Sequence, residues 1–247
     1  MTAQDNDNER KFHHFHCDPQ HDFIIKSNDG MHFRASRFHL ARVSTFFADM
    51  FSTATSSSTV NNRIEDIITL DYSAAAIKFF LDLAHSSDPK VPSIEFVSTA
   101  ASLFDLTTYT MCKTELQNIA RESLYTAGKR HPMDLLVIAS HRQDSTMAKT
   151  ALSYINYNPW TTSRKEQCQP NLRMFLRYLD RLDPTYAYEL VRNLLTVGPL
   201  PQESSKVVRY GFFLTPNWSS IADKFDPERR AESSKRPDES SSKKRKL

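Results

Sequence analysis

The chain has 247 residues, 39% of them hydrophobic, which is enough for one substantial domain with an appendage or for two small domains. Three widely spaced cysteines suggest no disulfide framework, and neither a signal peptide nor a membrane span can be recognised, so we expect a soluble intracellular protein without a membrane partner. The net charge is +3, but residues 223–247 alone carry nine basic and six acidic residues, which leaves 23 of each sign elsewhere and argues against a specific nucleic-acid-binding face.

Residues 1–20 are predicted to form a disordered tail because polar residue types dominate them. A histidine-rich cluster lies in and next to this segment, at His13, His14, His16, Cys17 and His21. The cluster fits no zinc-ligand spacing, and a closed zinc site needs four ligands held by a surrounding fold. We interpret it as part of a solvated tail, with a metal site as the less favoured alternative, and we expect no metal and no other cofactor.

Residues 22–51 carry the strongest local signals. Residues 22–27 are rich in β-branched and aromatic types, and the Asn-Asp-Gly sequence at 28–30 favours a tight hairpin turn after them. A second strand is predicted to follow, because apolar and polar residues alternate there. The alternating apolar residues are Met31, Phe33 and Ala35.

Two short helices are predicted next. Ser36 can cap the first, which carries Phe38 and Leu40, and Ser44 can cap the second. The apolar face of the second helix consists of Phe46, Phe47, Met50 and Phe51.

Loop, strand and helix signals then alternate. Residues 52–62 are expected to be a polar loop, and residues 64–71 a strand in which Ile68 and Leu70 face inward. Three amphipathic helices follow, the first capped by Ser73 and the second starting at Ser93. Their apolar positions are Ile77, Phe80, Leu81, Ala84, Val97, Ala100, Ala101, Phe104, Leu116, Ile119 and Ala120.

The order of these signals resembles the BTB/POZ domain, in a form common among fungal proteins. The matching residues are Phe33-Arg34, Arg37, Leu40-Ala41-Arg42, Ser44, Phe46-Phe47 and Asp49-Met50-Phe51. The sequence departs from the family at Ser36, where His is usual, and at Thr45, where Pro is usual. The resemblance implies an α+β fold over residues 21–127, in which a small three-stranded sheet is packed with short helices.

A domain boundary is predicted at residues 128–132, where Gly128 would end one helix and Pro132 would open another. Four short helices are expected beyond it, with Asp144 capping the second and with Pro170 and Pro184 opening the third and fourth. This layout over residues 131–198 resembles the helical extension that follows many BTB domains. A long loop is expected at residues 156–169.

The last part of the chain separates into two segments. Residues 199–222 contain an aromatic patch that we expect to dock on the helices rather than to bind a partner. Residues 223–247 are predicted to be a disordered basic tail. Two basic clusters in this tail resemble a bipartite nuclear import sequence, with a merely solubilising charged tail as the alternative. They are Arg229, Arg230, Lys243, Lys244, Arg245 and Lys246. The clusters predict an import receptor as a partner and the nucleus as the location, with the cytoplasm as the alternative.

No catalytic motif is recognised. The four glycines are too far apart for a G-x-G-x-x-G turn or a P-loop, and no H-E-x-x-H, G-x-S-x-G or paired C-x-x-C sequence occurs. We therefore predict a protein that is not an enzyme, with no catalytic residues and no small-molecule substrate.

The resemblance to BTB domains implies a function in protein association. Carried over to this sequence, it makes five residues candidates for a self-association surface: Phe23, Ile25, Phe38, Leu40 and Val43. The alternative is that these side chains pack in the core of their own chain, and we favour this alternative for Leu40.

Two functions compete under this resemblance. The first is a homodimeric nuclear adaptor or transcription-associated scaffold that binds protein partners. The second is a substrate adaptor of a cullin-based ubiquitin ligase, which we place behind the first because residues 54–58 lack the hydrophobic-x-Glu motif usual in such adaptors. A third interpretation, nucleic-acid binding through the tail, predicts weak and strongly salt-dependent binding.

Overall fold

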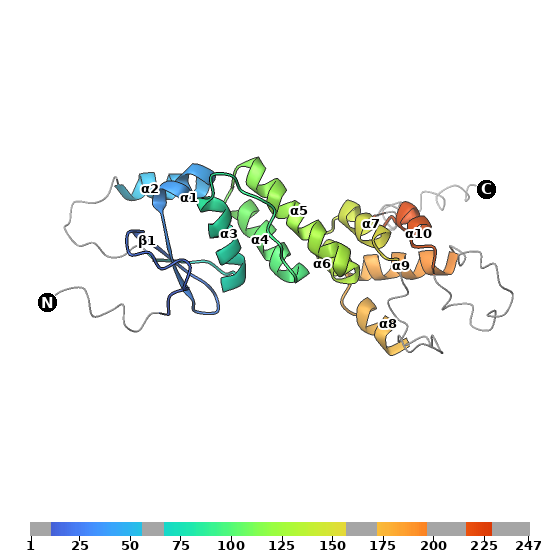
Figure 1. Ribbon diagram of the computed structural model, residues 1–247. Helices are drawn as coiled ribbons and strands as arrows, with labels where there is room; N and C mark the ends of the chain where they lie inside the picture. The colour runs from blue at the N-terminus through green and yellow to red at the C-terminus, as the bar shows by residue number, and fades with distance from the viewer. Residues whose placement is uncertain (1–10, 56–66, 157–171, 197–215, 229–247) are drawn as a thin grey trace, which may run out of the picture. The chain divides into compact units, whose positions relative to one another are not determined.

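The computed structural model describes residues 11–55, 67–156, 172–196 and 216–228 (Figure 1). The chain divides into two compact units, residues 1–127 and residues 128–247. Within the described ranges, no helix is long and apolar enough to cross a membrane.

A three-stranded sheet lies in the first unit, in the order β2-β1-β3. β1 (Phe23–Lys26) pairs antiparallel with β2 (His32–Ala35) and parallel with β3 (Ile67–Thr69). β2 alternates as predicted, with Phe33 and Ala35 buried, because successive side chains of a strand point to opposite faces. The structure confirms the predicted hairpin and the third strand that joins it.

The hairpin turn also anchors a helix. Gly30 has a φ of 83°, the positive value that the Asn-Asp-Gly sequence predicts. The Asp29 carboxylate accepts a hydrogen bond from Ser27 Oγ at 2.5 Å and from the backbone N–H of Ala74 at 3.2 Å. Because Ala74 begins α3 (Ala74–His85), Asp29 joins the hairpin to the N-terminus of this helix.

The described residues of the first unit also form helices. They are α1 (Arg37–Val43), α2 (Thr45–Thr55), α3, α4 (Val97–Tyr109) and α5 (Thr114–Arg130), which continues past the boundary between the units. The predicted capping residues Ser36, Ser44 and Ser73 each accept a hydrogen bond from a backbone N–H three residues later. α1 packs on α2 and α3, and α3 packs on α4 (Figure 1).

The start of α4 differs from the prediction. The helix begins at Val97 rather than at Ser93, and its capping residue Phe96 makes no side-chain cap hydrogen bond. Ile94 is buried. Burial of this side chain in an extended segment therefore prevails over the capping signal of Ser93.

The N-terminal segment also differs from the prediction of a disordered tail over residues 1–20. Residues 11–16 run along the outer edge of β2, where His13 N donates to His32 O at 2.8 Å and Arg34 N donates to His16 O at 2.8 Å. His16 is 7% exposed. Backbone groups of a sheet edge need partners, and this polar segment supplies them, so it is ordered without an apolar pattern of its own.

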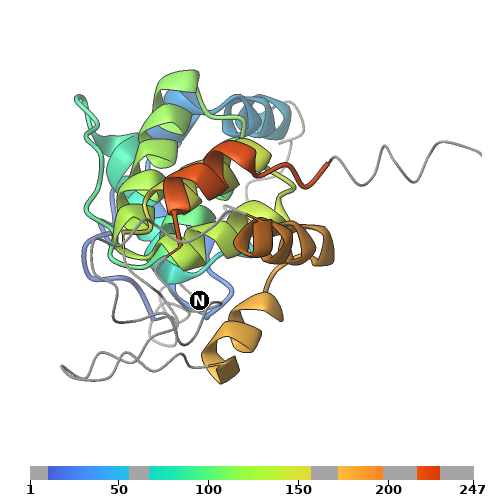
Figure 2. The same cartoon turned by 90° about the vertical axis from the view of Figure 1, so that its right-hand side faces the viewer.

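The second unit is helical in its described residues. Its helices are α6 (Pro132–His141), α7 (Ser145–Ser153), α8 (Leu172–Leu179), α9 (Pro184–Thr196) and α10 (Trp218–Lys224). Asp144 caps α7 through a hydrogen bond from Met147 N at 2.8 Å. α10 packs on both α7 and α9 (Figure 2). Pro170 and most of the predicted loop at residues 156–169 lie outside the described residues.

Gly128 does not end a helix, contrary to the prediction. It lies inside α5, and a Cβ atom at this position would be 2.4 Å from Leu135 Cδ2. The position therefore requires glycine because Leu135 packs against the backbone there, and not because the chain needs a left-handed conformation. The predicted boundary itself coincides with the division between the two units.

The first residues of the predicted disordered tail, 223–228, are ordered, and residues 229–247 lie outside the described residues. Lys224 ends α10, and Phe225 is fully buried against the ring of Tyr186, with 5.7 Å between ring centroids. Asp226 N donates to Glu189 Oε1 at 3.1 Å. Burial of this aromatic side chain, together with the hydrogen bond to Glu189, holds the first residues of this polar segment on the helices.

Candidate interaction surface

Four of the five residues predicted for self-association are buried within the first unit. Their exposed fractions are 2% for Phe23, 0% for Ile25 and Leu40, and 5% for Val43. β1 is the central strand of the sheet, and its first three residues are all buried, so both of its faces are covered. The four side chains therefore belong to the core of the unit in this structure, as the sequence favoured for Leu40.

Phe38 is the fifth candidate, and it is 71% exposed. It lies on α1, whose Leu40 and Val43 are buried, so it occupies the outer side of this helix. The ring of His39 lies beside it, with 5.4 Å between the ring centroids. Of the five predicted residues, Phe38 is the one whose side chain is accessible to a partner.

The helix that carries Phe38 is fixed at both ends. Near its start, Arg37 Nε lies 3.1 Å from Asp22 Oδ2, and the guanidinium group stacks over Phe23 at 5.6 Å. At its end, Arg42 Nη2 donates to two carbonyl oxygens at the end of α3, at 3.0 and 2.9 Å. These contacts hold α1 in one position, so binding at Phe38 would need little reordering of the helix.

A second exposed apolar group lies where α2 meets the end of α4. Tyr109 is 59% and Met111 52% exposed, and the ring of Tyr109 lies 5.8 Å from that of Phe46. Thr45 N donates to Met111 O at 3.3 Å, and this hydrogen bond fixes the corner. Sequence reasoning missed this group because its members come from two distant segments and share no helical period.

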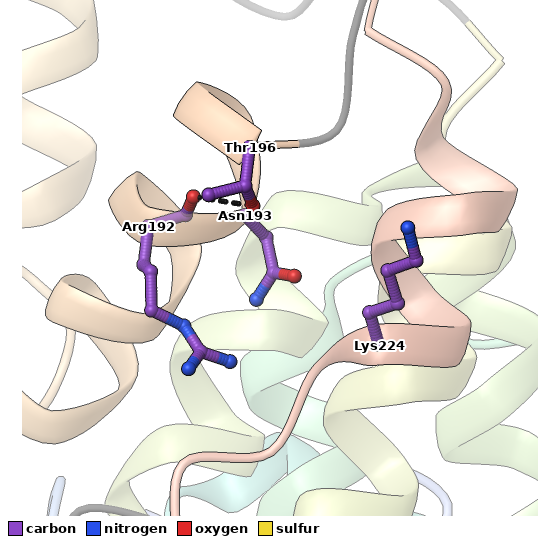
Figure 3. Close-up of a pocket in the computed structure, with 4 residues that line it drawn as sticks. All are labelled: Arg192, Asn193, Thr196 and Lys224. Carbon is purple, nitrogen blue, oxygen red and sulfur yellow. Dashed lines mark hydrogen bonds between the residues drawn. The ribbon is translucent and has the colours of Figure 1, made fainter.

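A small pocket lies between α9 and α10 of the second unit (Figure 3). Arg192, Asn193, Thr196 and Lys224 line it, and its volume is about 370 Å³. Arg192 Nη2 and Asn193 Nδ2 both donate to the buried carboxylate of Glu189, at 2.7 and 2.8 Å. Glu189 neutralises the guanidinium group of Arg192, so Lys224 contributes the remaining positive charge among the residues that line this pocket.

The remaining predicted site residues are the histidine-rich cluster, the basic clusters and the position of the cullin motif. Among the described residues, no group of three or more His, Cys, Asp or Glu is arranged to hold a metal ion. Of the histidine-rich cluster, His14 and Cys17 are exposed whereas His16 is buried. The two basic clusters of the predicted import sequence lie outside the described residues, as do residues 56–58 of the cullin-motif position.

Comparison with known proteins identifies the first unit. The family model of the BTB/POZ domain matches residues 12–120. No curated protein matches the chain. The matched range includes residues 12–20, which the sequence assigned to the tail, and it covers the sheet, α1 to α4 and the beginning of α5.

Proposed function

Because residues 12–120 form a BTB/POZ domain, which is a protein–protein interaction module, we propose that this chain is a self-associating nuclear adaptor or transcription-associated scaffold. Self-association through α1 is supported by one observation above all, the 71% exposure of Phe38 on a helix that is otherwise anchored in the core. A phenylalanine ring held in water on a rigid helix gains free energy when a partner covers it.

The oligomeric state of the full chain tests this proposal. Light scattering after size exclusion is expected to give a dimer for the wild type and a folded monomer for Phe38→Asp. Phe96→Asp is the matched control, because Phe96 is 63% exposed in the same unit but lies at the start of α4. Val43→Asp is unsuitable, since this side chain is buried and the variant would report unfolding.

Either of two results would overturn self-association through α1. One is a wild-type chain that is monomeric at micromolar concentration. The other is a Phe38→Asp variant that stays dimeric while circular dichroism shows it folded. Loss of the dimer in Phe96→Asp as well would show a general effect of added charge rather than an interface at Phe38.

Nuclear location is the second part of the proposal, and it is supported by the two basic clusters at 229–230 and 243–246. A fluorescent fusion of the full chain is expected in the nucleus, and alanine at Arg229, Arg230 and residues 243–246 should return it to the cytoplasm. Alanine at Lys235 and Arg236, inside the spacer, is the control that removes charge but leaves both clusters. Nuclear exclusion of the wild-type fusion would contradict this part.

The alternative role, a substrate adaptor of a cullin-based ubiquitin ligase, is tested by a separate measurement. BTB domains in general also bind cullins, so the full chain should be purified from cells and examined for a co-purifying cullin. A scaffold predicts none. A cullin that stays bound to the monomeric Phe38→Asp variant would replace the scaffold with the substrate adaptor.

A further inference from the structure

In the first unit, the rings of three histidines surround the ring of a fourth, and we call these four residues, which come from three parts of the unit, the imidazole cluster. They are His16 and His21 from the N-terminal segment, His39 from α1 and His85 from the last turn of α3. The rings of His16, His21 and His39 lie 5.8, 5.1 and 5.1 Å from that of His85, measured between centroids. The cluster thus joins the N-terminal segment to two helices of the domain.

The hydrogen bonds of the cluster require a neutral His85. The backbone N–H of Ser36 points at His85 Nε2 at 3.4 Å, so this nitrogen must present a lone pair rather than a proton. Ser36 is also the residue that caps α1. Protonation of His85 Nε2 would therefore set two donors against each other at the start of this helix.

The charged side chains near His85, Arg42 and Asp82, already bind other groups. From α1, Arg42 donates to the carbonyl oxygens of Ala84 and Ser86, on either side of His85. From α3, the Asp82 carboxylate faces the cluster, but it already binds His16 Nε2 at 3.0 Å and Lys78 Nζ at 2.6 Å. A second or third positive charge in the cluster would thus be poorly compensated.

The titration of these rings agrees with this geometry. The pKa of His85 is lowered to about 4, mainly by burial and also by the neighbouring His21, His16 and His39, while Asp82 opposes the shift. Burial is also the largest cause that lowers the pKa values of His16 and His39. A histidine released into water titrates near 6.5. Between about pH 6.5 and 4, the opened cluster therefore binds more protons than the closed one, and acid favours opening.

The N-terminal segment is the part most easily lost. Within this segment, residues 11–16 contact the outer edge of β2 through backbone hydrogen bonds, and the ring of His13 stacks on Phe33 at 5.0 Å. Phe15, by contrast, is 70% exposed. The segment buries little apolar surface, whereas β1 and β2 lie in the core, so the segment can detach while the sheet persists.

We propose that the imidazole cluster is a pH-sensitive contact, which holds residues 11–22 on the domain while its histidines are neutral and releases them when they are protonated. Release uncovers the backbone groups of His32 and Arg34 that this segment pairs at the edge of β2. Acidification thereby converts a covered sheet edge into an open one.

Cys17 provides a direct probe, because it is exposed and lies within the segment. A fluorophore is attached to Cys17 in the full-length chain carrying Cys168→Ser, while Cys112 is buried and protected from the reagent. The anisotropy of the fluorophore is followed from pH 7.5 to 4.5, together with far-ultraviolet circular dichroism. We expect a fall in anisotropy in this range at constant circular dichroism.

Substitution of His85 decides whether the cluster is responsible. His85→Gln keeps an acceptor for Ser36 N–H but cannot be protonated, so the midpoint of the anisotropy change should move about one pH unit lower. His14→Gln is the matched control, since His14 is an exposed histidine of the same segment outside the cluster, and its midpoint should not move. If His85→Gln fails to fold, His39→Gln should produce a smaller shift in the same direction.

Two results would overturn the proposal. The first is an anisotropy change that coincides with loss of circular dichroism, because the segment would then be part of the global unfolding unit. The second is an unchanged midpoint in folded His85→Gln or His39→Gln, which would place the titrating group elsewhere.

Discussion

The two units of this chain use different means to become stable. The first combines a sheet, whose β1 pairs with a strand more than forty residues later, with a core of large aromatic and aliphatic side chains. The second, in its described residues, consists of short helices whose packing is supplemented by a buried polar centre at Glu189. One unit therefore depends mainly on apolar volume, and the other also depends on a satisfied charge.

The stability of the two units should therefore respond to different kinds of substitution. Removing apolar volume from a packed core costs the transfer free energy of the lost atoms and leaves a cavity. Removing a buried hydrogen-bond acceptor leaves the donors around it without a partner. The tryptophans allow the units to be followed separately, since the chain has two, at 160 and 218, and both belong to the second unit.

The largest effect is expected in the core of the first unit. Phe47 is fully buried and its ring lies 6.2 Å from those of Phe23 and Phe80. Phe47→Ala should lower the free energy of unfolding of this unit by about 4 kcal/mol, measured by urea denaturation followed with circular dichroism. The matched control is Phe96→Ala, an exposed phenylalanine outside the proposed interface, which should change it by less than about 0.5 kcal/mol. Equal losses in the two variants would contradict the placement of both rings.

A smaller effect is expected at the polar centre of the second unit. Glu189→Ala leaves Arg192, the Asn193 amide and Asp226 N–H without their shared acceptor. We expect a loss of about 2 kcal/mol, seen as an earlier change in tryptophan fluorescence during urea denaturation. The conservative Glu189→Gln should lose less, because its amide oxygen can still accept. A Gln variant more stable than the wild type would show that the buried charge itself is unfavourable, and a loss in Gln as large as that in Ala would contradict the role of the shared acceptor.

The helix that continues from one unit into the other gives a third test. Gly128→Ala places a Cβ atom 2.4 Å from Leu135 Cδ2, and overpacking of this kind costs about 1 to 2 kcal/mol despite the better helix propensity of alanine. Differential scanning calorimetry should show a lower unfolding temperature. The double variant Gly128→Ala with Leu135→Ala should be less than additive, since the second change removes the clash. Stabilisation by Gly128→Ala alone would mean that the close approach is absent.

Much of the first unit could be predicted from the sequence, because its signals are local. The Asn-Asp-Gly turn, the alternation in β2 and the serine caps each depend on residues a few positions apart, and the structure contains all three. What failed were the positions decided by distant partners. Residues 11–16 have no apolar period and are ordered by the edge of β2, and Gly128 is explained by Leu135 rather than by a helix end.

The prediction of the candidate surface was limited in the same way, because the burial of a side chain depends on distant parts of the chain. The resemblance to BTB domains made Phe23, Ile25 and Val43 candidates for an interface, but the sequence cannot tell a core face from an interface when both sides of a strand are covered. Phe38 could be recognised as outward only relative to its buried neighbours on α1. The imidazole cluster was not predictable in sequence, because His39 and His85 meet the N-terminal histidines only after the hairpin and α3 are in place.

The smallest effect is expected at the turn of the hairpin, and it depends on pH. The Ser27 hydroxyl and the Ala74 N–H both donate to Asp29 and lower the pKa of its carboxyl group. A carboxyl whose pKa is lower in the folded state stabilises that state above its ordinary pKa, and the contribution is lost as the pH falls through the folded value.

Asp29→Ala should therefore lower the free energy of unfolding by about 1 kcal/mol at pH 7. The difference from wild type should shrink as the pH falls below the ordinary carboxyl pKa of about 3.9, because the folded protein then loses the contribution of the ionised group. Asp88→Ala is the control, because Asp88 is 84% exposed and its contact with Lys90 is 3.8 Å long, so its removal should have no measurable effect at either pH. A difference for Asp29→Ala that stays constant or grows on acidification would show that the turn is held by the backbone conformation of Gly30 and not by this carboxylate.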